Sequence, residues 1–421
     1  MNSKNTKIII VLIVSILILA GLIYYYFFLR GATPTSEFVP SETTGLFPSG
    51  GQGTPGGSTG ITEITDDSEN LPVPKYRKIS QKPVSGGVII STGDKEKGDK
   101  IRYVDRATGH IYETWTKSGE QVRISNTTIP KVYEAFWNKG GDSFIARYLD
   151  ENNEDIVSYF AKLKEKEGAE NLKEDMYELD GSFLQKNITD LSVSPAGKNI
   201  AYVVKKQSGS SVINSEFGGK NGSEIFNSPL TEWATEWFGN SFLLKTKPTY
   251  KTGGFVYRLD NQGGLTKILG NIKGLTTLGK NDGSSILYLE SLNNSFGLYS
   301  YNISSKEKTK LKLNTLPEKC VWSKKDSSVV YCAVPKTIQS GEYPDDWYQG
   351  IVSFDDIIWI LDTKINLGSV VTDPERYSAS SVDAIDLMLN ENEDYLIFTN
   401  KKDYSLWGID LVSEPIEFIG D

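Results

Sequence analysis

The sequence predicts an all-β fold: a six- or seven-bladed β-propeller of four-stranded antiparallel blades, preceded by one N-terminal transmembrane helix. Three observations support this prediction. A short strand–turn–strand motif recurs along most of the 421-residue chain, further strands follow most copies of the motif, and a long apolar run lies near the N-terminus. The repeated motif and the strands that follow it indicate the propeller, and the apolar run indicates the N-terminal helix.

The motif occurs six times between Trp137 and Tyr395 and consists of an apolar strand end, a polar turn and a second apolar strand. The equivalent residues in the six copies are Trp137, Val193, Trp237, Leu278, Trp322 and Leu389. The steps between them are 56, 44, 41, 44 and 67 residues, centred on the length of one propeller blade. The chain is therefore expected to be a repeat protein.

A third strand with an aromatic residue near its centre follows these pairs. It begins at Lys100, Gly254, Phe296, Asp356 and Tyr404. A more polar fourth strand follows in several units, as at Glu120 and Leu265, and four antiparallel strands in succession make one blade. The stretch from Val84 adds a seventh blade, unless it shares one blade with the C-terminal segment at Glu414; both counts remain open.

The apolar run covers residues 8–29 without a charge, long enough to cross the hydrocarbon layer of a membrane. Lys4 and Lys7 precede it, so the positive-inside rule places the N-terminus in the cytoplasm. We expect a cytoplasmic stub at 1–7, the helix at 8–29, a disordered Gly/Ser/Thr/Pro tether at 30–75 and the extracytoplasmic propeller at 76–421. The alternative is a signal peptide, although its apolar core is usually shorter.

The repeat also resembles a known family. The segment SPAGKNIAY from Ser194 is similar to the core of TolB-like (WD40-like) propeller repeats, and Trp322–Asp326 and Asn281–Gly283 resemble degenerate copies. The resemblance covers most of residues 137–421. It implies the propeller fold and a role as a scaffold, a periplasmic binding partner or the non-catalytic part of a peptidase.

The two cysteines, Cys320 and Cys332, each lie six residues from Asp326 at the centre of a predicted hairpin turn. They should therefore face each other across the hairpin, at a distance that permits a disulfide. An extracytoplasmic location would allow the bond to form. Reduced core cysteines are the alternative, whereas a metal site would need further ligands.

Composition and residue types limit the chemistry. Residues 31–421 hold 42 basic and 54 acidic residues, a formal charge of −12 that argues against nucleic acid as a partner. His110 is the only imidazole, so triad catalysis is disfavoured. Paired acids remain available for a hydrolase or lyase in the propeller funnel: Asp345, Asp346, Asp355, Asp356, Glu391, Glu393 and Asp394. No catalytic residue, metal ligand or cofactor is assigned.

One step of the repeat, from Trp322 to Leu389, is about 23 residues longer than the typical step, and the excess falls in Pro335–Asp356. Loops of this kind often carry function on rigid scaffolds. We expect a contact patch there, formed by Tyr343, Asp345, Asp346, Trp347 and Tyr348. The alternative is that the aromatic side chains fold back onto the blade. The chain is thus expected to be a surface module that binds protein, peptide or cell-wall glycan, with the carboxylate enzyme as the alternative.

Overall fold

The computed structural model of the chain describes residues 75–150, 152, 155–378 and 380–411. The predicted stub, the predicted transmembrane helix and all but the last residue of the predicted tether lie outside these residues. Within the described ranges, none of the helices has the length and apolar character needed to cross a membrane.

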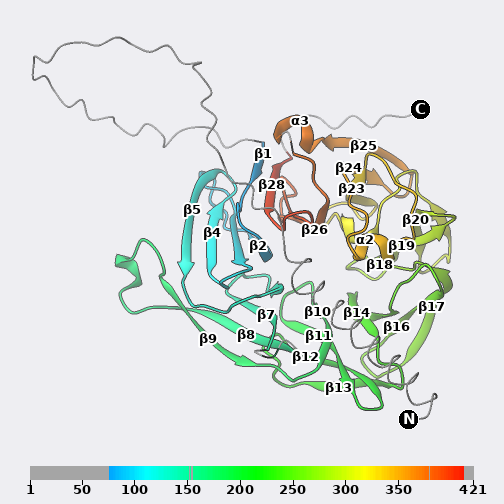
Figure 1. Cartoon of the computed structure of the whole chain (residues 1–421), viewed down its shortest axis with the longest axis horizontal. Helices are drawn as coiled ribbons and strands as arrows, with labels where there is room; N and C mark the ends of the chain where they lie inside the picture. Colours follow the sequence, from blue (N-terminus) through cyan, green and yellow to red (C-terminus); the bar gives the residue numbers. More distant parts are fainter. Residues whose placement is uncertain (1–74, 151, 153–154, 379, 412–421) are drawn as a thin grey trace, which may run out of the picture. The chain divides into compact units, whose positions relative to one another are not determined.

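The described chain forms seven separate sheets, each of four antiparallel strands, arranged as the blades of a seven-bladed propeller (Figure 1). Blade 1 contains β2 (Val84–Ile90), β3 (Lys100–Asp105), β4 (Ile111–Trp115) and β5 (Ser118–Ser125). Blade 2 contains β6 (Glu134–Trp137), β7 (Ser143–Leu149), β8 (Ile156–Glu165) and β9 (Tyr177–Phe183). Blade 3 contains β10 (Ile188–Val193), β11 (Asn199–Lys206), β12 (Gly209–Glu216) and β13 (Ser223–Ser228).

The remaining blades repeat this order. Blade 4 contains β14 (Trp233–Phe238), β15 (Ser241–Thr246), β16 (Gly253–Leu259) and β17 (Leu265–Lys273). Blade 5 contains β18 (Thr277–Gly279), β19 (Ser285–Leu292), β20 (Ser295–Asn302) and β21 (Lys308–Lys310). Blade 6 contains β22 (Cys320–Trp322), β23 (Val329–Pro335), β24 (Asp356–Asp362) and β25 (Leu367–Thr372). Blade 7 contains β26 (Ala384–Leu389), β27 (Tyr395–Asn400), β28 (Leu406–Asp410) and β1 (Tyr76–Lys78). Short helical turns, η3 (Ala169–Asn171), η4 (Pro317–Lys319), α2 (Asp345–Tyr348) and α3 (Pro374–Ser378), lie in the connections.

The ring closes in blade 7, where the N-terminal strand β1 pairs with β28. The Tyr76 ring stacks on Trp407 at a centroid distance of 4.9 Å, so the seam between the chain ends is packed as well as hydrogen-bonded. This closure decides the blade count: the stretch from Val84 is the first strand of its own blade. The strand at Lys100 is the second strand of that blade, which corrects the expectation of a third strand. The segment from Glu414 lies outside the described residues.

Adjacent blades pack face to face, and this explains the apolar runs in the second strands. In β11, residues Ile200–Val204 are all buried because a neighbouring blade covers each face of the sheet. The turn before it requires Gly197, whose φ is +70° and where a Cβ would lie 2.3 Å from the backbone nitrogen of Lys139 in blade 2. The polar turn of the repeat is therefore also a contact between blades.

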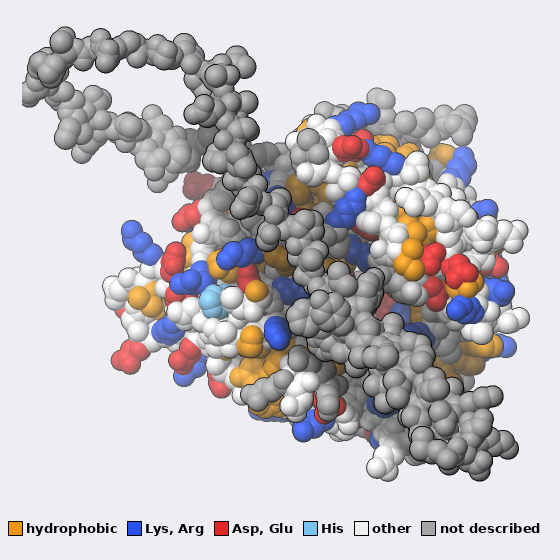
Figure 2. All heavy atoms as spheres, viewed as in Figure 1, with side chains coloured by type: hydrophobic (Ala, Val, Ile, Leu, Met, Phe, Trp, Pro, Cys, Tyr) orange, Lys and Arg blue, Asp and Glu red, His pale blue; other side chains and the backbone are white. Residues whose placement is uncertain are grey.

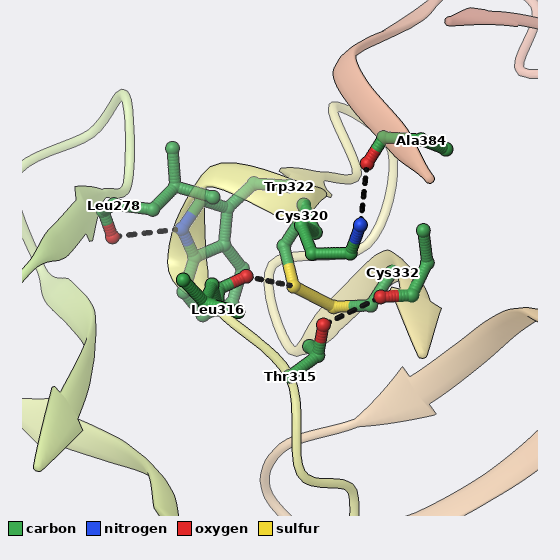
Figure 3. Close-up of a disulfide and its surroundings, with 9 residues drawn as sticks. Leu278, Thr315, Leu316, Cys320, Trp322, Cys332 and Ala384 are labelled. Carbon is green, nitrogen blue, oxygen red and sulfur yellow. Dashed lines mark hydrogen bonds between the residues drawn. A yellow bond between two sulfur atoms is a disulfide. The ribbon is translucent and has the colours of Figure 1, made fainter. Parts of the chain in front are cut away.

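The predicted disulfide is confirmed. Cys320 and Cys332 are directly opposed on β22 and β23 and are joined by a disulfide (Figure 3). Both residues are buried, and the Trp322 indole beside them points toward Leu278 of blade 5. The bridge thus lies inside the contact between blades 5 and 6.

Two ends of the propeller can be distinguished. The first strand of each blade lies toward the centre of the ring, as β2, β10, β14, β18 and β26 do in Figure 1. Turns between first and second strands, and those between third and fourth strands, lie at one end, which we call the turn face. Connections between blades, and those between second and third strands, lie at the other end. This end carries the long connection of blade 6, and we call it the insertion face.

Candidate functional site

The predicted insertion is the connection between the second and third strands of blade 6. Its predicted bounds agree with the structure, since β23 ends at Pro335 and β24 begins at Asp356. Helix α2 is its central turn and lies close to the inner strands β18 and β26 (Figure 1). The insertion therefore reaches toward the axis of the propeller.

Most of its aromatic residues are in the core. The side chains of Tyr343 and Trp347 are only 1% and 3% exposed, and they pack with Phe354 and Phe296 in one cluster. These two aromatics therefore follow the alternative, in which they fold back onto the propeller. Their burial attaches the insertion to blade 5.

A buried ionic network completes this attachment. Asp383 accepts hydrogen bonds from the Trp347 indole nitrogen at 3.0 Å and from the backbone nitrogen of Phe354 at 3.0 Å. The amine of Lys319 contacts Asp383 and also lies 2.7 Å from Asp356, and all three charged side chains are fully buried. Burial raises the pKa of Asp356 to about 6 against the opposing effect of Lys319. These acids are thus structural partners of the insertion.

The two acids at the start of α2 also have structural partners. Asp345 accepts hydrogen bonds from the Thr249 hydroxyl at 2.9 Å and the Tyr250 backbone nitrogen at 2.8 Å, both in blade 4. Asp346 accepts a hydrogen bond of 2.7 Å from the backbone nitrogen of Glu342. Asp345 therefore links the insertion to blade 4, and Asp346 fixes its internal turn.

Two apolar residues of the insertion remain open to solvent. Tyr348 is 44% exposed and Ile351 is 68% exposed, and we call them the tip pair. Although Tyr348 is partly exposed, its hydroxyl is enclosed by protein and donates to Glu318, and this enclosure together with the carboxylate raises the pKa of the phenol well above its ordinary value. Lys401 donates to the carbonyl of Trp347 at 2.7 Å, so the backbone beneath the tip pair is held from blade 7 as well.

The other predicted acid pairs do not form one site. Asp355 contacts Lys402, Glu391 contacts Lys324 at 2.9 Å, and Glu393 accepts hydrogen bonds from the Ser323 hydroxyl. His110 has its ring nitrogen 3.3 Å from the Thr128 hydroxyl, in the turn between β3 and β4. Over the part of the chain that the structure describes, no three His, Cys, Asp or Glu residues are grouped to hold a metal ion.

Charged side chains that the sequence analysis did not single out meet instead around the axis. The acids lie on or just before the first strands of five blades, and the two bases lie on the second strands β7 and β15; we call this set the axial ring. Its acids are Glu134, Asp190, Glu236, Glu318 and Asp386, and its bases are Arg147 and Lys245. Elsewhere, acidic and basic side chains are interspersed over the visible face of the propeller (Figure 2).

Four of the five acids have close partners. Glu134 lies 2.7 Å from Arg147, and Glu236 lies 2.8 Å from Lys245. Asp190 accepts a hydrogen bond of 2.6 Å from the Thr235 backbone nitrogen, and Glu318 accepts one from Tyr348. Burial would lower the pKa of Lys245, but its carboxylate neighbours, Glu236 first, outweigh burial and raise it.

Asp386 differs from the other four. It forms no hydrogen bond or ion pair with any residue that the structure describes, and its side chain is open to solvent. It occupies a β-bulge of β26 with a φ of +54°, a conformation that non-glycine residues seldom adopt and that often marks a functional position. Surrounding protein and the nearby Glu134 raise its pKa to about 6.

A signal in the sequence could have found part of this ring. Glu134, Asp190 and Asp386 each stand three residues before the aligned residue of their repeat, and Lys319 of the buried ionic network holds the same position in its own repeat. When the repeats are aligned, four of the six copies therefore have a charged residue at this position. Such a residue is unexpected there, because the first strands of a propeller usually face the core or the axis.

Comparisons with known proteins show likeness in fold. No protein-family model and no curated protein matches the chain. Solved structures do: TolB from Acinetobacter baumannii matches with a TM-score of 0.39 and 10% identity over 79% of this chain and 64% of that one. An oligogalacturonate lyase from Vibrio parahaemolyticus matches with a TM-score of 0.52 and 10% identity over 80% and 94% of the two chains.

The TolB-like resemblance is confirmed as a likeness of fold. Prolyl oligopeptidase B from Galerina marginata matches with a TM-score of 0.49 and 8% identity, over 80% of this chain and 50% of that one. Because a fold does not determine a function, function has to be argued from this chain's own residues.

Proposed function

We propose that this chain is a membrane-anchored, non-catalytic surface module that binds a protein, peptide or cell-wall glycan partner through the insertion. The supporting observation is the contrast within the insertion itself. Tyr343, Trp347 and Phe354 are buried and bonded to the blades, whereas Tyr348 and Ile351 are exposed. A rigid base that presents exposed apolar side chains lowers the entropic cost of binding.

The location of the module follows from the N-terminal segment. Residues 8–29 would anchor the chain, with Lys4 and Lys7 keeping the N-terminus in the cytoplasm and the propeller outside. Protease added to intact cells should then release a fragment that begins near Tyr76. Protection of that fragment in intact cells would reject this topology.

The experiment for binding is affinity capture from native membranes with the full chain. The variant Tyr348→Ala/Ile351→Ala should lose its partner while keeping the melting temperature of the wild type. Ile365→Ala is the matched control, because Ile365 is 59% exposed in the turn between β24 and β25, on the turn face. If the double variant captures the same partner as the wild type, the tip pair is not the contact.

A second candidate is a carboxylate-based hydrolase or lyase in the propeller funnel, and Asp386 is the observation that favours it. A general acid needs a raised pKa, and Asp386 has one beside the ion-paired carboxylate of Glu134. Against this candidate, four of the five axial acids are held by partners. Release of reducing ends from glycans by the wild type, abolished in Asp386→Asn, would favour the enzyme over the binding module.

A further inference from the structure

A separate cavity of about 220 Å³ lies on the insertion face, where blades 4 and 5 meet the insertion. Blade 4 contributes Tyr250 and Lys273, blade 5 contributes the turn Ser291–Ser295, and the insertion contributes Gly341–Tyr343. The insertion is an addition to the regular blade, so this cavity is a feature that the insertion creates.

The walls of the cavity are fixed to one another. The Gly341 backbone nitrogen donates to the Asn294 carbonyl at 2.9 Å, and the Ser291 hydroxyl donates to the Tyr343 carbonyl. Gly274, which has a φ of +68°, lets blade 4 approach this contact: a Cβ there would lie 2.0 Å from the Ser291 hydroxyl oxygen. The cavity is therefore built by three elements in close contact.

Three of the polar side chains that line it are available to a ligand. The amides of Asn293 and Asn294 and the amine of Lys273 form no hydrogen bond or ion pair with any described residue. Each amide offers an acceptor and two donors, which suits a ligand rich in hydroxyl groups. The opposite charges of Lys273 and Glu342 give the lining no net preference for an ion.

We propose that this cavity binds one ring of a neutral saccharide. Its volume is below that of sites for drug-sized ligands, so it would hold a single ring of a longer chain. The site goes beyond the proposed contact because it includes neither Tyr348 nor Ile351.

The test is calorimetric titration of the full chain with three trisaccharides: maltotriose, N,N′,N″-triacetylchitotriose and trigalacturonate. A polyoxyethylene detergent is used, because the sugar head group of an alkyl maltoside would compete. At least one neutral trisaccharide should bind tenfold more tightly than trigalacturonate, and the two neutral arms distinguish plain from acetamido sugars. No binding of either neutral sugar at about 10 mM, or equal binding of trigalacturonate, would overturn the proposal.

The variant Asn293→Ala/Asn294→Gly removes both amides, and glycine keeps the positive φ of +61° at position 294. It should weaken binding at least tenfold, and Asn240→Ala/Asn281→Ala, on exposed turns of the turn face, should not. If the first variant misfolds, Lys273→Ala together with Glu342→Gln should weaken binding in its place; unchanged affinity rejects the site. Tyr348→Ala/Ile351→Ala should bind saccharide normally, so this proposal and the proposed function can fail separately.

Discussion

The indole nitrogen of Trp237 in blade 4 donates a hydrogen bond of 3.1 Å to the carbonyl of Ser192 in blade 3. The equivalent bonds run from Trp137 to Gly86 at 3.3 Å and from Trp322 to Leu278 at 3.4 Å. The same contact thus joins blades 1 and 2, blades 3 and 4, and blades 5 and 6. The other three copies of the repeat have Val193, Leu278 and Leu389 at this position and join to the preceding blade without an indole.

Trp237→Phe should lower the free energy of unfolding, because it keeps an aromatic ring but leaves the Ser192 carbonyl without its donor. The expected loss from the hydrogen bond is about 0.5–1.5 kcal/mol, measured by urea denaturation. Trp359→Phe is the control, since the Trp359 indole nitrogen donates to no residue that the structure describes. If both variants lose the same free energy of unfolding, the loss comes from the smaller ring and not from the hydrogen bond.

Trp347→Ala should destabilise the fold by about 3–5 kcal/mol, because it opens a cavity in a packed cluster and removes the donor to Asp383. Tyr348→Ala, one residue away and 44% exposed, should change stability far less. Both are measured by chemical denaturation. A larger loss in Tyr348→Ala would mean that the insertion is not held through Trp347.

Replacing both cysteines by alanine should cost about 3 kcal/mol, as expected for releasing a loop of this length in the unfolded chain. Cys320 and Cys332 are separated by 12 positions. Thiol counting on the unreduced, denatured protein provides the direct check. Two free thiols per chain would contradict the bridge.

Asp386→Asn should stabilise the protein increasingly as the pH rises from about 4 to 7. The folded-state pKa of about 6 lies above the unfolded value of about 3.9, so the folded state binds the proton more tightly. In the wild type, the stability contributed by Asp386 is therefore present at low pH and is lost as the pH rises through 6. Melting temperatures of both proteins across this range test the sign.

Glu167→Gln is the matched control for that series, because Glu167 is exposed in the connection between β8 and β9, far in sequence from the axial ring. Both variants are measured side by side with the wild type over the same pH range. A difference from the wild type that stays constant with pH in Asp386→Asn would contradict the raised pKa of Asp386.

The fold was predictable because its signals are local. Each polar turn with its two flanking apolar strands lies within about 15 residues, and the opposed positions of Cys320 and Cys332 follow from one hairpin. The blade count was not predictable, because it depends on the pairing of Tyr76 with Ile409 at opposite ends of the chain. No local pattern reports such a contact.

The candidate site was predictable only in part, for the same reason. The insertion was found from its length, but the burial of Trp347 depends on Asp383, which lies in the next blade and has no sequence pattern of its own. Tyr348 and Ile351 are exposed, and Ile351 is not among the residues of the predicted patch. The axial ring combines single residues from distant repeats, so its members become neighbours only when the ring is closed.

Closure through β1 has a consequence for the order of events during synthesis. Of the described strands, the one that completes blade 7 is made first, and its partner β28 is made last. Tyr76–Lys78 therefore stays without this partner until the other described strands have been translated. A contact between such distant residues forms slowly. We therefore expect the incompletely folded molecule to be most accessible to chaperones or proteases before β1 has docked.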